Sequence, residues 1–166
     1  MIEIREMKKP EYGFLSEMLY EAIYFSDKNQ KLPKSIIFEP HISKYFENFG
    51  RKGDFAFVLT AENDLVGAIW TRLFSATDKS YGFVDEDTPE LSMAIKEGYR
   101  NKGFGNQLIV KIFEKLKASG FKKVSLSVDK RNRAVNLYRR FGFEAISEKG
   151  TAYTMLKSFE QQIMTD

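Results

Sequence analysis

The chain has 166 residues, of which 43% are hydrophobic and 14% aromatic, a composition that suits one compact domain with its own buried core. It contains no cysteine, which excludes disulfides, thiol nucleophiles, cysteine-ligated zinc and iron–sulfur clusters. The formal net charge of +3 is too small to require a nucleic-acid partner. No apolar run reaches the roughly 18 residues of a membrane span, and no leader pattern opens the chain, so we expect a cytoplasmic protein with no membrane partner.

The first residues of the chain predict one strand and one helix. Ile2 and Ile4 alternate with charged residues, which is the pattern of a half-buried strand. After Pro10, apolar residues recur at helical spacing as far as Ile23, and proline suits the first turn of a helix. Residues 26–39 show no firm period, so we expect a loop there.

The middle of the chain predicts a short helix followed by three strands. The helix is expected to follow Pro40, with apolar residues on one face and Gly50 just past its end. Residues 54–74 are rich in aromatic and β-branched residues and carry good turn formers at 62–64, as in a hairpin. Residues 89–95 predict the third strand.

The last part of the chain alternates helices and strands. Residues 105–120 carry one apolar stripe and end in glycine, residues 123–128 alternate as a strand, and residues 134–141 predict a short helix. Residues 151–156 predict a strand, and we expect one or two strands after the helix at 134–141. This order predicts a mixed α/β sandwich with helices on both faces of the sheet.

Two glycines and two cations stand between the strand at 89–95 and the helix that follows. A helix start leaves backbone N–H groups free and carries a partial positive charge. Gly103 and Gly105 would let the backbone approach a ligand, while Arg100 and Lys102 add full charges, so the segment predicts a pyrophosphate cradle. It lacks the Lys-Ser/Thr pair of a nucleotide P-loop and the third glycine of a Rossmann fingerprint. A tight turn with solvated cations is the alternative.

Two motifs resemble those of the GNAT superfamily of N-acetyltransferases. Arg100, Gly103 and Gly105 match its R/Q-x-x-G-x-G/A signature, and "RAVNLYRRFGF" at 133–143 resembles its second motif, an A-x-x-L-Y run closing in G-F. The motifs span residues 90–143, and the order of elements fits as well. The resemblance implies an α/β fold with a mixed, mostly antiparallel sheet, helices on both faces, and splayed fourth and fifth strands.

The resemblance also implies that residues 1–166 form a single acetyltransferase domain with acetyl-CoA between the splayed strands. Its pyrophosphate would meet the glycine turn, and its pantetheine arm would pair with the fourth strand like an added strand. The implied cofactor-binding residues are Met93, Ala94, Ile95, Arg100, Asn101, Lys102, Gly103, Phe104, Gly105 and Asn106. Core packing is the alternative for Met93 and Ile95.

A further cofactor contact is expected from the segment before the second motif. The family often places asparagine seven residues before the motif tyrosine, where this chain has Arg131. We therefore expect Asn132, one residue later, to contact the cofactor, with Arg131 or Arg133 as alternatives. No metal is expected, since His41 is the only histidine.

Transfer to an amine needs a base, because an ammonium of pKa about 10.4 is neutral in roughly one molecule in 2,500 at pH 7. Glu90 is the candidate base, with Asp85 in reserve; a surface acid is the alternative reading of Glu90. The resemblance implies that the Tyr138 hydroxyl lies beside the sulfur and protonates the departing thiolate, while packing in a short helix is its alternative. A backbone N–H at Met93 or Ile95 would stabilise the carbonyl oxygen.

The acceptor is expected to be a small-molecule or peptide amine. Acids before the fourth strand would attract a cation, and nearby aromatic rings would wall it or make cation–π contacts. The residues expected in these roles are Trp70, Phe83 and Asp85. A solvated loop and ordinary core packing are the alternatives.

Two other functions compete with an enzyme. A non-catalytic acyl-CoA-binding sensor would keep the cradle, although retention of Tyr138 disfavours it. A nucleic-acid binder is disfavoured because the aromatic residues are not interleaved with the cations, so no nucleic-acid partner is expected. Edge strands near the C-terminus could pair two subunits, and homodimers are common among the proteins that the chain resembles.

Overall fold

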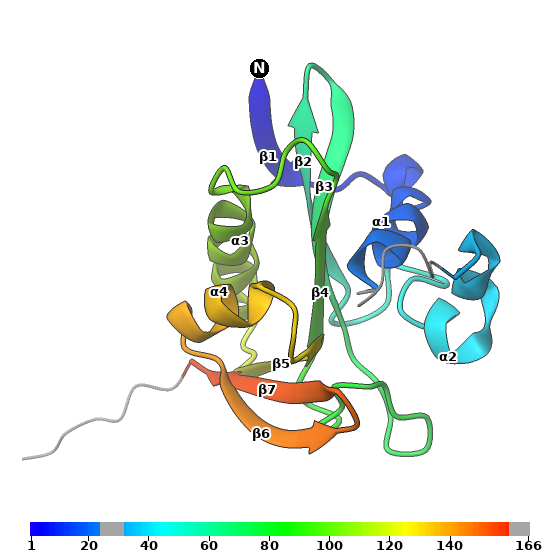
Figure 1. Ribbon diagram of the computed structural model, residues 1–166, viewed down its shortest axis with the longest axis vertical. Helices are drawn as coiled ribbons and strands as arrows, with labels where there is room; N and C mark the ends of the chain where they lie inside the picture. The colour runs from blue at the N-terminus through cyan, green and yellow to red at the C-terminus, as the bar shows by residue number, and fades with distance from the viewer. Residues whose placement is uncertain (24–31, 160–166) are drawn as a thin grey trace, which may run out of the picture.

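The computed structural model describes residues 1–23 and 32–159, and within them seven strands form one sheet with helices on both faces (Figure 1). The strands are β1 (Ile2–Glu6), β2 (Phe55–Ala61), β3 (Asp64–Arg72), β4 (Glu90–Ile95), β5 (Lys123–Asp129), β6 (Glu144–Lys149) and β7 (Ala152–Ser158). The helices are α1 (Phe14–Ala22), α2 (Pro40–Ser43), α3 (Phe104–Ala118) and α4 (Ala134–Arg140), with 3-10 helices at Lys9–Glu11 and Lys34–Phe38.

Every neighbouring pair of strands is antiparallel except β4 and β5. The order across the sheet is β1-β2-β3-β4-β5-β7-β6. β4 pairs with β3 along its whole length, from Arg72–Glu90 to Gly67–Ile95. With β5 it runs parallel and pairs only at Glu90 and Ser125. The two strands therefore diverge beyond Glu90, which confirms the expected fold, including its splayed fourth and fifth strands.

The two faces of the sheet bury separate hydrophobic cores. In Figure 1, α3 and α4 lie on one side of β4, and α1 and α2 lie on the other. On the first side α3 buries Leu108 and Ile112 completely against the sheet. On the second side α1 buries Leu15 and Met18 in a core that includes Trp70 of β3.

Several predicted elements are confirmed. The hairpin is β2 and β3, and its turn holds Glu62 and Asn63 at positive φ, 49° and 71°. Two strands close the chain, β6 and β7. The expected loop at 26–39 contains a 3-10 helix at Lys34–Phe38, and its first residues lie outside the described chain. No helix within residues 1–23 and 32–159 is long and apolar enough to cross a membrane.

The first helix begins later than its sequence suggests. Pro10 lies in the 3-10 helix at Lys9–Glu11, and α1 starts only at Phe14. The Glu11 carboxylate accepts hydrogen bonds from the Lys8 N–H at 2.8 Å and from the Arg5 guanidinium of β1 at 2.9 and 2.7 Å. These bonds hold a separate turn against β1 before the helix can start.

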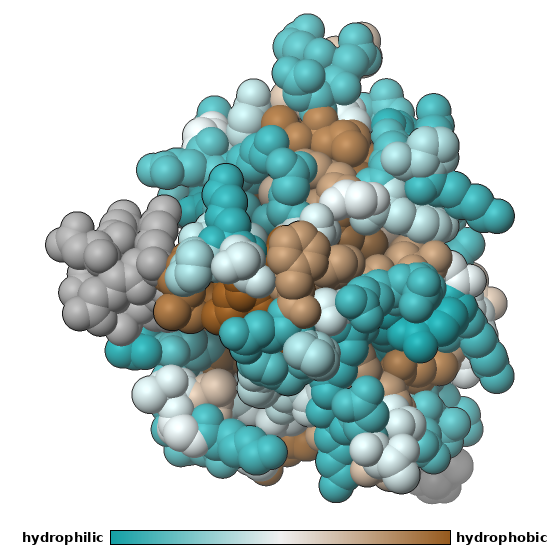
Figure 2. All heavy atoms as spheres, turned by 90° about the vertical axis from the view of Figure 1, so that its right-hand side faces the viewer, coloured by the Kyte–Doolittle hydropathy of each residue, from teal (hydrophilic) through white to brown (hydrophobic). Residues whose placement is uncertain are grey.

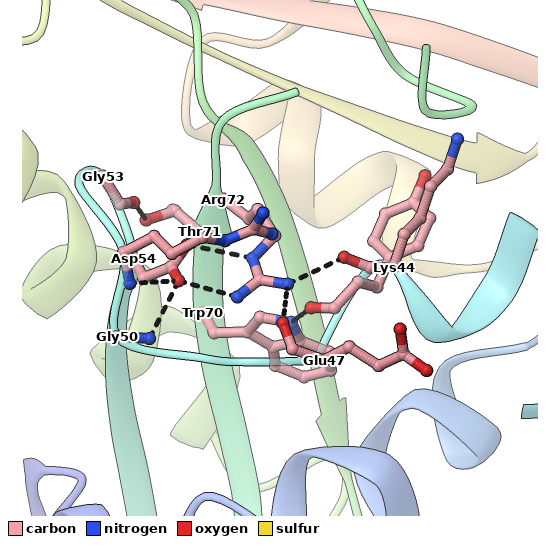
Figure 3. A network of polar contacts seen from close by, with 10 residues as sticks. Lys44, Glu47, Gly50, Gly53, Asp54, Trp70, Thr71 and Arg72 are labelled. Carbon is pink, nitrogen blue, oxygen red and sulfur yellow. Dashed lines mark hydrogen bonds and ion pairs between the residues drawn. The ribbon is translucent and has the colours of Figure 1, made fainter. Parts of the chain in front are cut away.

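The predicted helix up to Gly50 is wrong in its length, since α2 covers only Pro40–Ser43. The Arg72 guanidinium of β3 takes the carbonyl oxygens of Lys44 and Glu47 as acceptors (Figure 3). Carbonyls that are drawn to a side chain in this way leave the i to i+4 bonding of a helix. Tertiary contacts thus convert an amphipathic pattern into a series of turns.

The same arginine fixes the segment after α2 to the sheet. Arg72 and Asp54 form an ion pair at 2.7 Å, and both side chains are 1% exposed. The Asp54 carboxylate also accepts hydrogen bonds from the N–H groups of Gly50 and Arg51 (Figure 3). Arg72 is the direct neighbour of Glu90 across the β3–β4 pair. The Arg72–Asp54 ion pair therefore lies next to the point where β4 and β5 begin to diverge.

Candidate active site

The site is built around the gap that opens between β4 and β5. The Ser125 N–H donates to the Pro89 carbonyl at 3.0 Å, next to the single register pair of Glu90 and Ser125. Both strands run from this pair toward their C-terminal ends, where α3 follows β4 and α4 follows β5. A ligand in the gap would therefore meet the starts of two helices.

The edge of β4 that faces the gap is set by strand alternation. The Lys96 N–H donates to the Val66 carbonyl of β3 at 2.8 Å. Because backbone groups of successive residues point to opposite edges of a strand, the N–H groups of Met93 and Ile95 face the gap. Those of Ala94 face β3, and its side chain packs with α1. The expectation that Ala94 pairs with a cofactor through its backbone is therefore wrong.

The turn between β4 and α3 presents a row of backbone N–H groups. Gly98, Asn101 and Gly103 have φ values of 96°, 60° and 84°. Across the described residues, the N–H groups of residues 100–106 find no acceptor in the protein. α3 starts directly behind them with the partial positive charge of its first turn, so the turn suits a polyanion.

Gly103 and Gly105 serve different purposes in this turn. Gly103 is left-handed, and a Cβ there would meet nothing within 4 Å, so its conformation is what requires glycine. A Cβ on Gly105 would lie 3.1 Å from Leu137 Cδ2 and 3.6 Å from Met93 Cε. Gly105 therefore lets α3 approach α4 and β4 closely, and the structure brings the predicted motifs together.

The predicted polar side chains of the turn are exposed, and Arg100 already has partners. Its Nε donates to the Ile95 carbonyl at 2.6 Å, and its Nη2 donates to the Glu21 carboxylate of α1 at 3.2 Å. The Lys102 ammonium lies 6.0 Å from the centre of the Tyr99 ring. Arg100 thus holds the turn against the end of β4 and against α1.

The remaining residues of the predicted cradle divide into exposed and packed ones. Asn101 and Asn106 are exposed, whereas Phe104 packs against the core beneath α3. Asn132 lies just before α4, where its side-chain oxygen accepts the Ala134 N–H at 2.9 Å. The amide nitrogen of Asn132 is the group left for a ligand.

Tyr138 projects from α4 into the core on the α3 side. It is 6% exposed, and its ring meets Phe143 edge-on at 5.7 Å. Within residues 1–23 and 32–159 its hydroxyl has no hydrogen-bond partner, and no polar side-chain atom there is both fully buried and unpaired. The hydroxyl must therefore reach accessible space. Burial raises the pKa of Tyr138, so the phenol is protonated at neutral pH.

Glu90 is the most enclosed acid of the site. It is 3% exposed, its Oε1 accepts hydrogen bonds from Ser80 Oγ at 2.6 Å and Gly82 N–H at 2.8 Å, and its Oε2 accepts one from the Tyr45 hydroxyl at 2.5 Å. Burial raises the pKa of Glu90, while these donors and the Lys44 ammonium act in the opposite direction. Its surface-acid alternative is wrong.

Sequence reasoning missed the partners of Glu90. The sequence places Tyr45 only on the apolar face of the helix predicted after Pro40, and it indicates no role for the loop that holds Ser80 and Gly82. No spacing rule links Glu90 with a tyrosine 45 residues earlier. The three hydrogen-bond donors of Glu90 come together only in the folded chain.

Trp70 does not contact an acceptor. It is 1% exposed, and its indole N–H donates to the Tyr45 carbonyl at 3.0 Å. A side chain in this position has no surface to offer a ligand, so the acceptor role predicted for Trp70 is wrong. Its core alternative is the one that the structure supports.

Asp85 and Phe83 lie in the loop before β4. The Asp85 carboxylate accepts hydrogen bonds from the Asp87 N–H and the Thr88 hydroxyl and lies 3.3 Å from the Lys123 ammonium. These partners lower the pKa of Asp85 despite partial burial. Lys123 precedes Ser125 in β5, so Asp85 lies on the closed side of the gap, away from its opening. Phe83 is half-buried.

The face that carries α1 and α2 shows apolar side chains among hydrophilic ones (Figure 2). Tyr81 is 51% exposed, and its ring is stacked on the buried Tyr45 ring, 6.5 Å away and inclined by 15°. The centre of the Phe74 ring lies 5.1 Å from that of the Tyr45 ring. An aromatic cluster therefore covers Glu90 on this face. The described residues contain no group of acids and histidine that could hold a metal ion.

Residues 16–143 match the family model described as Acetyltransferase (GNAT) family. The PaiA N-acetyltransferase of Thermoplasma acidophilum, solved with coenzyme A, is 19% identical over 96% of this chain and 99% of its own, with a TM-score of 0.67. YncA of Salmonella typhimurium, a putative acetyltransferase solved with acetyl-CoA, is 15% identical over 100% and 98%, with a TM-score of 0.70. The ribosomal-protein-S18-alanine N-acetyltransferase of Escherichia coli is 17% identical over 100% of both chains, with a TM-score of 0.65. No curated protein matches.

Proposed function

Because this chain belongs to the Acetyltransferase (GNAT) family, we propose that it moves the acetyl group of acetyl-CoA directly to a primary amine of a small molecule or peptide. The observation that carries the proposal is the gap between β4 and β5, which opens beside a row of backbone N–H groups that have no acceptor within residues 1–23 and 32–159. Such a gap can hold an extended ligand arm, and the row of N–H groups can hold its pyrophosphate.

Backbone groups would make most of the cofactor contacts. The N–H groups of residues 100–106 would bind the pyrophosphate, and those of Met93 and Ile95 would pair with the pantetheine arm. One of these two N–H groups would also lie beside the carbonyl oxygen and stabilise its developing charge. Two relatives solved with coenzyme A or acetyl-CoA support this choice of ligand.

Tyr138 would serve the departing sulfur from the α4 side of the gap. Its hydroxyl reaches accessible space, and its raised pKa keeps it protonated. An ordinary thiol has a pKa of about 8.5, below that of the phenol, so the thiolate does not strip the proton from Tyr138 at equilibrium. The residue would stabilise the sulfur chiefly by donating a hydrogen bond.

Glu90 would act as the base from the opposite face of the sheet. Its side chain points to the α1 and α2 side, whereas Tyr138 belongs to the core under α3 and α4. Both carboxylate oxygens of Glu90 already accept hydrogen bonds from protein groups, so the amine proton would reach Glu90 through water. The acceptor would enter from the face that carries α1 and α2.

Calorimetric titration with acetyl-CoA tests the cradle, with ATP and NAD as control ligands. The Arg100→Ala, Gly103→Ala double variant should lose micromolar acetyl-CoA binding, because it removes a cation and strains the turn. Lys111→Ala, which removes an exposed cation from α3 outside the turn, should bind like the parent chain. Binding of ATP or NAD as tight as that of acetyl-CoA, or no acetyl-CoA binding, would refute the cradle.

A second function is favoured by one observation, the enclosure of Glu90. A carboxylate with three protein donors can be purely structural, which would leave a non-catalytic acyl-CoA-binding sensor. Thiol release from acetyl-CoA in the presence of an amine library separates the two functions. If the chain binds acetyl-CoA but no amine causes release of the thiol, the protein is the non-catalytic sensor.

A further inference from the structure

We propose that Tyr45 is a positioning residue for Glu90: its hydroxyl holds the carboxylate at the start of the gap between β4 and β5. The catalytic meaning of this role rests on the proposed function, in which Glu90 is the base. Tyr45 follows α2 in the sequence and lies on the face from which the acceptor would enter.

Tyr45 is the one described residue that holds Glu90 Oε2. Its hydroxyl donates to that oxygen at 2.5 Å, and it accepts a hydrogen bond from the Tyr81 N–H at 3.0 Å. The other carboxylate oxygen, Oε1, accepts from Ser80 and Gly82. Each oxygen is therefore held from a different segment, and the orientation of the carboxylate depends on both segments.

The loop that holds Ser80 and Gly82 packs tightly against the Glu90 carboxylate. A Cβ on Gly82 would lie 2.8 Å from Glu90 Oε1 and 2.8 Å from the Leu126 carbonyl carbon of β5. The Gly82 carbonyl accepts the Ser125 hydroxyl at 2.7 Å. The Glu90 carboxylate is thus packed against Gly82 on its Oε1 side, close to β5, and the Tyr45 hydroxyl covers its Oε2 side.

Tyr45 is itself held in place before any ligand binds. Its carbonyl accepts the Trp70 indole N–H at 3.0 Å, and its ring contacts those of Phe74 and Tyr81. The neighbouring carbonyl of Lys44 is bound by the Arg72 guanidinium at 2.9 Å (Figure 3). A hydroxyl on so fixed a backbone and ring is preorganised to orient its partner.

The ionisation of Glu90 should report this contact. The titratable and charged groups around it are Lys44, Tyr45 and Tyr81, with Arg72 as its neighbour on β3 and Asp54 paired to that arginine. A donor to a carboxylate favours its charged form. Removing the Tyr45 hydroxyl should therefore raise the pKa of Glu90 further.

The test compares the full chain with its Tyr45→Phe variant, using ¹³C NMR of labelled glutamate carboxyls and Glu90→Gln for assignment. The midpoint of Glu90 should move up by about one pH unit, a tenfold change in its acid dissociation constant. With an amine found by library search, the acidic limb of the kcat profile should move by the same amount. Tyr12→Phe removes a hydroxyl from a ring that contacts Phe49 in the same core, and it should move neither.

Glu90→Gln provides a second test, should Tyr45→Phe fail to fold. Burial and the Glu90 charge raise the pKa of Tyr45, so removing that charge should lower it, and a Tyr45 pKa that does not move would overturn the contact. An unchanged Glu90 midpoint in Tyr45→Phe would overturn the role of Tyr45. A moved midpoint with an unmoved kcat limb would overturn the role of Glu90 as base. Absence of turnover with any amine would count against the proposed function alone, because the NMR midpoint would still decide the role of Tyr45.

Discussion

At the level of single residues, the Tyr138 hydroxyl and the Glu90 carboxylate differ in their hydrogen-bond partners. Tyr138 packs among apolar groups, and its hydroxyl has no partner in the described chain, so burial alone raises its pKa. Glu90 is buried as deeply but holds three donors, so burial and hydrogen bonding oppose each other there. The first group is free to serve a ligand, whereas the second is tied to the protein.

Replacing Tyr138 by phenylalanine should separate chemistry from cofactor binding. We expect Tyr138→Phe to lower kcat by about 10²-fold, the lower end of the effect of removing one positioned hydrogen-bond donor from a developing anion. The acetyl-CoA dissociation constant should stay within about twofold, since the backbone makes most of the proposed contacts. Thiol release and calorimetry measure the two quantities, with Tyr153→Phe as the control. An unchanged kcat would remove the role assigned to Tyr138.

Glu90 should also leave a signature in the pH dependence of stability. Its pKa is raised in the folded chain, so its contribution to the free energy of unfolding is present below its unfolded pKa and is lost as pH rises through its folded pKa. Glu90→Gln can keep the acceptor for Ser80 and Gly82 and should lack this loss. Urea unfolding of both chains from pH 4 to 8 measures the difference. Parallel curves would contradict the raised pKa.

At the scale of elements, the segment that follows α2 depends on one buried ion pair. Arg72 and Asp54 are each 1% exposed, and Arg72 also binds two carbonyls of that segment. The pair therefore connects the end of β3 with the segment that carries Tyr45. Breaking it should loosen the acceptor side of the site while leaving α3 and its turn in place.

Arg72→Met tests this connection. Removing one partner leaves the Asp54 carboxylate buried without its cation, which should lower the free energy of unfolding by about 3 to 5 kcal/mol. The Arg72→Met, Asp54→Leu double variant should recover part of that loss because no charge is left unpaired. Urea unfolding gives both values. Relative to the parent chain, Arg72→Met should speed amide hydrogen exchange in residues 44–54 more than in α3. Equal losses in the single and double variants would argue against the ion pair as the cause.

At the scale of the whole molecule, the gap between β4 and β5 divides the sheet into two parts. β1 to β4 lie on one side of it and β5, β7 and β6 on the other, joined in the sheet by the pair of Glu90 and Ser125. A ligand that bridges the gap would contact both parts and the starts of α3 and α4. Binding there should therefore stabilise the molecule as a whole.

Acetyl-CoA should raise the unfolding temperature in proportion to the logarithm of its concentration. At 100 times the dissociation constant the expected stabilisation is about 2.7 kcal/mol, which follows from binding to the folded state alone. Thermal unfolding at several cofactor concentrations measures it. The Arg100→Ala, Gly103→Ala variant should show a much smaller rise, and an equal rise would place the ligand elsewhere.

Most of the elements, their order and the conformation of the turn at Gly103 can be predicted from local features of the sequence. Apolar spacing marks the buried stripe of α3, and Gly103 marks a backbone conformation that other residues adopt at a cost. The two short motifs were enough to predict the splayed strands, which the β4–β5 register confirms. Contacts that depend on neighbours in sequence can be derived from spacing.

The surroundings of Glu90 and the accessibility of the predicted residues depend instead on contacts between distant parts of the chain. Trp70 became core, Ala94 turned its backbone to β3, and Tyr45 became the partner of an acid 45 residues away. The expected helix after Pro40 stopped early because Arg72 captured its carbonyls. Burial, strand alternation and hydrogen bonds between distant segments arise only when the chain closes on itself, and local patterns do not encode them.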